Sequence, residues 1–162
     1  MQRSWKEFFK LISIQGKIIL GDAMLSEKEV KEKVKKGYLK VYMAFEVVGT
    51  ARDVVENALK EHVEKFAKDE RVEMISRKDF EVEEIEARGR KLFSKFSEVE
   101  FLTRTFENLV NLVLFYGPSA CEILAPERIE IELGEAQSIL NTLGSLMHGL
   151  SERIGGIVVR RE

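Results

Sequence analysis

The fold of this chain is decided by residues 38–69, which read YLKVYMAFEVVG and then TARDVVENALKEHVEKFAKD. The first part alternates in hydropathy, which predicts a strand whose apolar face carries Leu39, Val41, Met43, Phe45 and Val47. The second part has helical spacing and predicts a helix with a buried stripe formed by Val55, Leu59, His62 and Phe66. Thr50 is predicted to be the N-cap of this helix. Asp53 would complete the capping box at the third helical position, where a Glu is more usual. The stretch therefore predicts a strand–turn–helix unit.

A second, more loosely spaced set of elements follows at residues 92–133. Residues 92–106 predict a long strand with a possible bulge near Ser97. Residues 107–116 are nearly all apolar and predict a short helix that is buried on most sides and ends at the Gly-Pro that follows. A last strand is predicted over residues 120–133, in which Pro126 makes a break or a bulge or marks an edge strand.

Further elements lie between and around these two sets. Residues 71–79 predict a strand, and the highly charged residues 81–91 predict a mobile connection. Residues 135–150 predict an amphipathic helix, and residues 3–14 predict a shorter one. The KIIL run at residues 17–20 is compatible with a short strand.

The segment before the first strand has good local signals for a helix over residues 26–36. Ser26 and Glu29 form a capping box, Leu25 and Val30 fit a hydrophobic staple, and Gly37 predicts the end of the helix.

The order strand, helix, strand, strand, helix, strand predicts an α+β fold, a ferredoxin-like β-α-β-β-α-β sandwich with a four-stranded antiparallel sheet. Extra N-terminal helices are expected in residues 1–37, the ferredoxin-like domain with its C-terminal helix in residues 38–152, and a tail in residues 153–162. The second face of the sheet carries Tyr42 beside glutamates and needs cover, so we expect Tyr42 to be partly buried. An amphipathic helix or a second copy of the chain would provide that cover.

Composition limits the classes of function. The chain has 162 residues, 44% of them hydrophobic and 33% charged, with a net charge of −2, which predicts a soluble domain with a real core and no strong attraction to polyanions. The abundance of Glu and Lys is typical of thermophiles. Cys121 is the only cysteine, and no apolar run is long enough to span a membrane, so we expect a cytoplasmic protein.

Several functions of ferredoxin-like domains are disfavoured by the residues present. Glutamates on the open sheet face would repel RNA phosphates. Metal carriage would need two cysteines in the first strand–helix loop, and that loop has none. His62 and His148 lie far apart in the sequence, so no metal site is expected, and Cys121 fits a small core residue better than a nucleophile. No catalytic set and no cofactor motif is discernible.

The chain resembles a group of small, uncharacterised archaeal proteins with a ferredoxin-like domain. The residues that carry the resemblance are the strand end Phe45-Glu46-Val47-Val48-Gly49, the segments Leu92-Phe93-Ser94 and Glu98-Val99-Glu100, and Pro118-Ser119-Ala120-Cys121-Glu122-Ile123-Leu124-Ala125-Pro126-Glu127. The resemblance covers about residues 38–150 and implies the fold and an archaeal origin. It implies no activity.

The strand order is also similar to that of effector-binding domains of the ACT type. This similarity implies side-by-side pairing and a small metabolite at the first strand–helix loop. In this chain the candidate ligand-binding residues are Gly49, Thr50, Arg52 and Asp53: glycine for close approach, a helix N-terminus for an anion, and an arginine for a carboxylate. The alternative interpretation is a simple turn followed by an N-cap.

The sequence thus favours a non-enzymatic, homo-oligomeric domain that binds a small anionic metabolite, without a cofactor or metal, and with neither membrane nor nucleic acid as partner. Two alternatives stay open. One is a protein-interaction scaffold. The other is an enzyme with dispersed active-site residues or an RNA-associated protein.

Overall fold

The computed structural model describes residues 19–20, 25–87 and 89–153. The chain divides into two compact units, residues 1–128 and residues 129–162, and each is described here by itself. The helix expected over residues 3–14 lies outside the described residues, as does nearly all of the expected tail.

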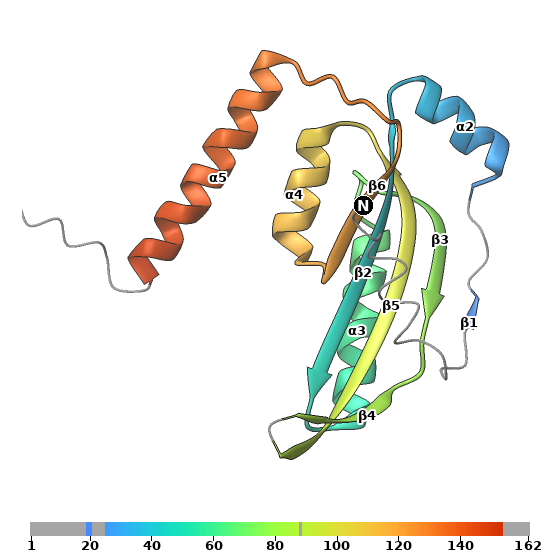
Figure 1. The fold of residues 1–162 in the computed structure, drawn as a ribbon, viewed down its shortest axis with the longest axis vertical. Coiled ribbons are helices and arrows are strands. Elements are labelled where there is room, and N and C mark those ends of the chain that lie inside the picture. The colour runs from blue at the N-terminus through green and yellow to red at the C-terminus, as the bar shows by residue number, and fades with distance from the viewer. Residues whose placement is uncertain (1–18, 21–24, 88, 154–162) are drawn as a thin grey trace, which may run out of the picture. The chain divides into compact units, whose positions relative to one another are not determined.

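The first unit contains an antiparallel sheet of six strands (Figure 1). The strands are β1 (Ile19–Leu20), β2 (Leu39–Gly49), β3 (Glu73–Asp79), β4 (Glu83–Ala87), β5 (Arg90–Thr103) and β6 (Ala120–Ala125). Their order is β1-β3-β5-β2-β6, and β4 pairs with the start of β5. The four strands β3-β5-β2-β6, joined by one helix after β2 and one after β5, form the ferredoxin-like arrangement. The predicted fold class is confirmed.

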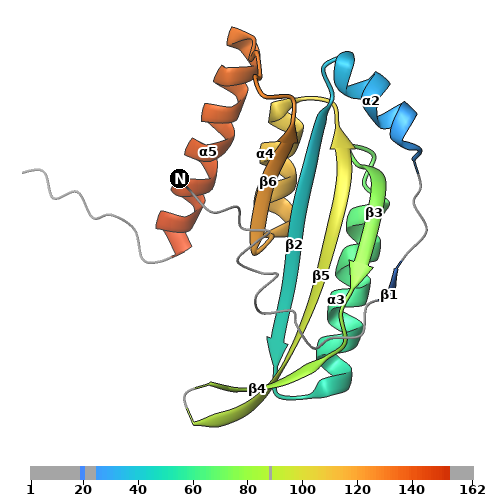
Figure 2. The same cartoon turned by 45° about the vertical axis from the view of Figure 1, so that its right-hand side comes forward.

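The helices are α2 (Glu27–Lys35), α3 (Arg52–Ala67), α4 (Phe106–Tyr116) and, in the second unit, α5 (Leu133–Arg153). Figure 2 shows α3 and α4 behind the sheet, on the same face. The helices predicted over residues 26–36, 107–116 and 135–150 are all present, and α5 is longer than predicted.

The two central strands, β2 and β5, pair without interruption over eleven residue pairs, from Leu39 opposite Thr103 to Gly49 opposite Phe93. The bulge expected near Ser97 is therefore not in β5. The irregularity lies in the neighbouring strand β3, between Met74 and Ser76. The extra residue is accommodated there because β3 is a short strand of seven residues and is nearer the edge of the sheet.

The core between the sheet and α3 is built around Phe66. Its ring centroid lies 5.2 Å from that of Phe45, 5.0 Å from that of Phe101 and 5.1 Å from that of Tyr116. The rings meet at interplanar angles between 59° and 85°, the tilted and edge-to-face geometries that aromatic quadrupoles favour. Phe66 therefore joins α3, α4 and both central strands in one contact cluster.

The buried stripe of α3 differs from the prediction at one position. Val55, Leu59 and Phe66 are buried as predicted, but the fourth member is Val63. His62 is half-buried at the border of the stripe, where a ring nitrogen donates to the carbonyl oxygen of Tyr116 at 2.9 Å. The histidine can reach a polar partner from this border position, whereas the apolar valine takes the fully buried one.

The second face of the sheet is more buried than expected. Tyr42 is 1% exposed, and it forms an apolar cluster with Ala44 and Ala120, against which Phe96 and Leu124 pack. The Tyr42 hydroxyl donates to Glu98 at 3.1 Å. Burial, together with the nearby carboxylates, raises the pKa of Tyr42 far above its usual range, so this hydroxyl stays protonated.

The predicted start of α2 is confirmed and that of α3 is wrong. The Ser26 side chain accepts from the Glu29 amide, and the Glu29 carboxylate accepts from the Ser26 amide, as a capping box requires. The N-cap of α3 is Ala51, which makes no side-chain cap. The backbone stays extended through Ala51, with φ −125° and ψ 128°, so Thr50 lies one residue too early to cap the helix.

Three other expectations need correction. Within residues 81–91, expected to be a mobile connection, residues 83–87 instead form strand β4, which is paired with the start of β5. The strand predicted over residues 120–133 ends at Ala125, before Pro126. Helix α4 is only partly buried, since Leu114 is 36% exposed and Phe115 is 62% exposed.

The observed N-caps predict different losses of stability for two similar threonine-to-alanine substitutions. In α4 the Thr105 side chain accepts from the Asn108 amide at 3.1 Å, so Thr105→Ala should cost about 1 kcal/mol of unfolding free energy. Thr50→Ala should cost less than about 0.5 kcal/mol, since Thr50 is exposed and caps nothing. Urea unfolding of both variants checks this, and equal losses would contradict the placement of the caps.

A cleft at the start of helix α4

A cleft of about 450 Å³ opens at the end of the sheet where β2 begins and β5 ends, the upper end in Figure 2. Several segments meet there: the residue before β2, the turn after α3, the first residue of β3, the end of β5 and the first turn of α4. The cleft is lined by Tyr38, Glu70, Arg71, Glu73, Leu102, Thr103, Arg104 and Asn108. Its volume falls in the range of small-molecule sites, roughly 300–1,000 Å³.

Thr103 is the unusual residue of this cleft. Its side chain is 0% exposed, and its hydroxyl oxygen has no hydrogen-bond partner among the described residues. A buried hydroxyl without a partner costs free energy, and the large majority of buried polar groups in proteins avoid that cost. A polar group that enters the cleft and reaches this hydroxyl would remove the cost.

The charges around the cleft leave one cation uncompensated. Arg71 is held by Asp69, and Glu73 is paired with Lys33. Arg104 is exposed and makes no hydrogen bond or ion pair with any described residue. It directly precedes the N-cap of α4, where the helix dipole also favours an anion, although the acidic Glu107 in the first turn offsets part of that effect.

One wall of the cleft is fixed by an ion pair. Arg71 donates from Nε to Oδ1 of Asp69 at 2.8 Å and from Nη2 to Oδ2 at 2.7 Å. The Tyr116 hydroxyl donates to the same carboxylate at 2.9 Å, which links the turn after α3 to the end of α4. These hydrogen bonds, that of Arg71 above all, hold the pKa of Asp69 well below its usual range.

The residues predicted to bind a ligand lie at the other end of β2. Arg52 donates from Nη2 to the carbonyl oxygen of Val82 at 2.7 Å, so it holds the segment before β4. A Cβ on Gly49 would lie 2.9 Å from Cγ2 of Val55, so the glycine allows the strand end to approach α3 closely. Neither residue lines the cleft near α4. Thr50 is exposed, and Asp53 lies in the first turn of α3.

The cysteine and His148 were the other groups considered for a reactive or metal-binding site, and neither has the features of one. Burial raises the pKa of the Cys121 thiol to about 11, so little thiolate forms at neutral pH. His148 lies 3.2 Å from Glu152 on the same helix. Within the described residues no group of three or more His, Cys, Asp or Glu side chains could hold a metal ion.

The cleft could not be recognised in the sequence because its lining residues come from separate elements. Residues 70–73 and 102–108 are brought together only by the pairing of β3 with β5. One local signal was present: Thr105 is a good N-cap residue, and Arg104 stands directly before it. A basic residue beside a helix N-terminus favours an anion, but the sequence could not show that Thr103 is buried without a partner.

Residues 40–162 match the model of the MJ0538 family. The chain belongs to the MJ0538 family. That family is named after a protein of Methanocaldococcus jannaschii, which agrees with the predicted resemblance to archaeal proteins. The match begins near residue 38, where the resemblance was expected to start, and runs past its expected end at residue 150. No curated protein and no solved structure matches the chain. None of the described helices is long and apolar enough to cross a bilayer.

The Asp69–Arg71 pair predicts a dependence of stability on acid pH. Because the folded-state pKa of Asp69 is depressed, its contribution is fully present above the unfolded value near 4 and is lost as the pH falls below it. Asp69→Asn should therefore destabilise the protein at pH 7 and flatten the fall in stability below about pH 4. Urea unfolding between pH 7 and pH 3 measures this, and an unchanged slope would contradict it. Glu81→Gln, a change at an exposed carboxylate, is the control.

Proposed function

We propose that this protein is a non-enzymatic binding domain of archaeal cytoplasm that takes up a small anionic metabolite in the cleft at the start of α4 and acts as a homo-oligomer. The observation that carries the proposal is the hydroxyl of Thr103, a residue of the cleft lining, which is buried without a hydrogen-bond partner among the described residues. Arg104 would bind the negatively charged group of the ligand. The Thr103 hydroxyl and the side-chain amide of Asn108 would fix the orientation of the ligand.

The lining of the cleft suits a ligand with a carboxylate. Arg104 supplies a planar donor pair of the kind that binds carboxylates in two places. Glu70 is exposed at the same cleft and would favour a ligand that also carries an amine. Amino acids and small di- or tricarboxylates are therefore the first compounds to test, with inorganic phosphate as the simplest anion.

The loop at Gly49–Asp53 remains the alternative anion site. It keeps a helix N-terminus that carries no side-chain cap, which favours an anion. Against it stand the hydrogen bond that engages Arg52 and the close contact of Gly49 with Val55. A comparison of Arg52→Ala with Arg104→Ala separates the two sites.

A protein-interaction scaffold is the second candidate function. It is favoured by α5, six of whose large apolar side chains are exposed. An enzyme with dispersed active-site residues is less favoured, since the two carboxylates in the cleft lining have other roles: Glu70 is exposed and Glu73 is paired with Lys33.

Thermal shift assays with citrate, phosphate and single amino acids test the proposal. Wild type should melt at a higher temperature with at least one of them. Arg104→Ala should weaken that binding roughly 10- to 100-fold, the usual worth of a charge-assisted hydrogen bond. Arg90→Ala, which removes an exposed arginine outside the cleft, should leave binding unchanged. A wild type that shifts with none of these anions would count against the site.

Thr103→Val gives a sharper test, because it separates stability from binding. The substitution removes the partnerless hydroxyl with little change of shape, so the free protein should become more stable, by up to about 1 kcal/mol. The same variant should lose part of the ligand-induced shift. If Thr103→Val were instead strongly destabilised, the hydroxyl would have a partner within the fold, and the argument for the cleft would fail.

A further inference from the structure

The second face of the sheet, opposite to α3 and α4, has deeply buried residues although no described helix of the first unit lies on it. Figure 2 shows α3 and α4 behind the sheet and α2 beyond its upper end. Tyr42 nevertheless has only 1% of its surface exposed, and Ala44 has 0%. A large ring that stands on a sheet face loses its contact with water only when other atoms lie above it. This face therefore needs a cover.

The part of the face that needs the cover, here called the sheet patch, is apolar at its centre and acidic around it. Its centre is the buried cluster around Tyr42. Around the centre, β2, β3, β5 and β6 carry two lysines and four glutamates: Lys40, Lys78, Glu46, Glu98, Glu100 and Glu122. Four glutamates against two lysines leave an excess of two negative charges. Glu73, at the end of the sheet, is balanced by Lys33 of α2.

Strand β1 brings the preceding part of the chain to the edge of the sheet patch. One row of paired residues crosses the sheet from β1 to β6: Leu20, Lys78, Glu98, Ala44 and Ala120. The chain before β1 therefore leaves the sheet at the level of the buried centre. Neighbouring strands lie about 4.8 Å apart, so Ala44 is about 14 Å from β1.

The sequence before β1 has the properties that such a cover requires. Residues 3–14 have the spacing of an amphipathic helix, with one apolar side made of Trp5, Phe8, Phe9 and Ile12. Residues 1–18 carry four basic residues and one acidic residue, a net charge of +3 that is opposite in sign to that of the patch. As a helix, residues 3–14 would be about 18 Å long, and residues 15–18 can span about 13 Å. The segment is therefore long enough to reach the patch from β1.

We propose that residues 3–14 form an amphipathic helix that lies on the sheet patch of the same chain. Its apolar side packs on the cluster around Tyr42, and its lysines extend toward the acidic border of the patch. This arrangement closes the second face of the sheet to RNA and to a second copy, so a homo-oligomer forms through another surface. None of the residues of the patch lines the cleft near α4, so the inference is independent of anion binding there.

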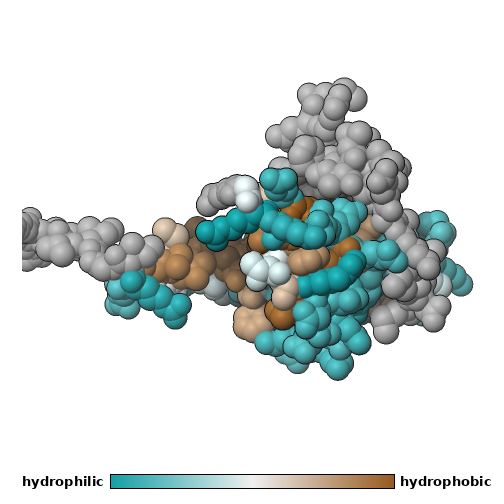
Figure 3. Space-filling model, turned by 90° about the horizontal axis from the view of Figure 1, so that it is seen from below, coloured by the Kyte–Doolittle hydropathy of each residue, from teal (hydrophilic) through white to brown (hydrophobic). Residues whose placement is uncertain are grey.

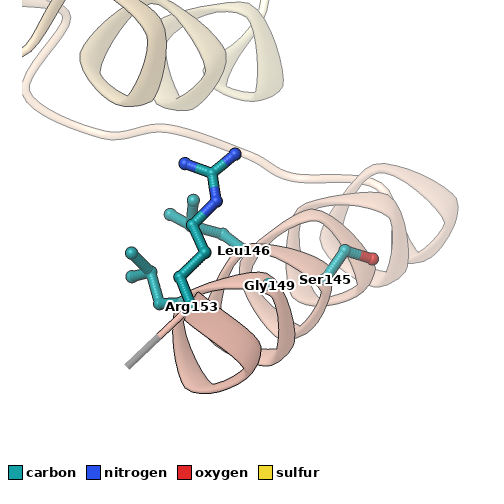
Figure 4. A pocket seen from close by; sticks show the side chains of 5 residues that line it. Ser145, Leu146, Gly149 and Arg153 are labelled. Carbon is teal, nitrogen blue, oxygen red and sulfur yellow. The ribbon is translucent and has the colours of Figure 1, made fainter. Parts of the chain in front are cut away.

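Helix α5 is the second candidate for this cover, and its composition fits the sheet patch less well. Residues 136–151 read AQSILNTLGSLMHGLS and contain no Asp, Glu, Lys or Arg, so they add no charge opposite to that of the patch. Arg153 follows in the last turn, where its side chain lies with that of Leu146 beside a cavity of about 180 Å³ on the helix (Figure 4). In Figure 3 brown, hydrophobic side chains gather next to the grey C-terminal trace, where α5 ends.

Trp5 is the single tryptophan of the chain and reports on the position of the N-terminal segment. In the full chain with Cys121→Ser, a nitroxide label at Ser76→Cys lies on the second face, in the pair with Glu100. This label should quench most of the Trp5 fluorescence, because nitroxides quench only at short range. A label at Glu61→Cys, exposed on α3 at the other face, should leave the fluorescence nearly unchanged. Equal quenching by the two labels, or quenching by neither, would overturn the proposal.

Phe8→Asp tests whether the apolar side of the segment makes the contact. A carboxylate at this position would be buried against the cluster around Tyr42, so the segment should leave the sheet and the label at residue 76 should no longer quench Trp5. Glu7→Gln, a change of the neighbouring residue outside the apolar side, should leave the quenching as it was. Circular dichroism shows whether each variant is folded. Quenching that survives Phe8→Asp would contradict the proposed contact.

A mixing experiment separates the chain's own segment from that of a second copy. Chains labelled at residue 76 and carrying Trp5→Phe are unfolded and refolded together with unlabelled chains that keep Trp5. The Trp5 fluorescence of this mixture should stay unquenched, because each segment covers its own sheet. Quenching in the mixture would show that a second copy supplies the cover and would overturn the proposal. No anion is needed in these measurements, so their failure leaves the cleft near α4 untouched.

Discussion

The pairing of β2 with β5 is the constraint on which the rest of the first unit depends. These strands are neighbours at the centre of the sheet, and the outer strands pair with them or with each other. Their alternation sends Phe45 and Phe101 toward α3, and Tyr42 and Glu98 toward the second face. A shift of either strand by one residue would bring carboxylates to the α3 side and remove the aromatic contacts of Phe66. The register is therefore fixed by the difference in hydropathy between the two faces.

The same register also positions the cleft. Because Thr103 is the last residue of β5 and pairs with Leu39, the first residue of β2, it lies where the sheet ends and helix α4 has yet to begin. Backbone pairing holds Thr103 in place regardless of its side chain, so the hydroxyl can remain without a partner. Folds tolerate such local costs at sites that bind other molecules, and this is why the hydroxyl carries more weight than the arginines around it. The ferredoxin-like fold itself assigns no function.

Much of the fold could be predicted from local patterns, because hydropathy alternation and helix stop signals act within a few residues. The predictions failed where a choice depended on distant contacts. Strand β4 consists mostly of charged residues, so its sequence resembles that of a loop and the strand was not predicted. Charged residues are nevertheless expected in an exposed edge strand. Thr50 has the right side chain for an N-cap, but the backbone stays extended for one more residue. The cleft joins the turn after α3 to the start of α4, and no local pattern links those segments.

Helix α5 shows how far a periodic pattern can be taken. Its amphipathic sequence predicted the helix correctly, yet a pattern gives only the apolar side and not what covers it. Ile139 is 9% exposed, whereas Leu140 and Met147 on the same helix are 62% and 61% exposed. The apolar side therefore contains both a buried position and exposed ones, and the hydropathy of the residues alone does not distinguish them.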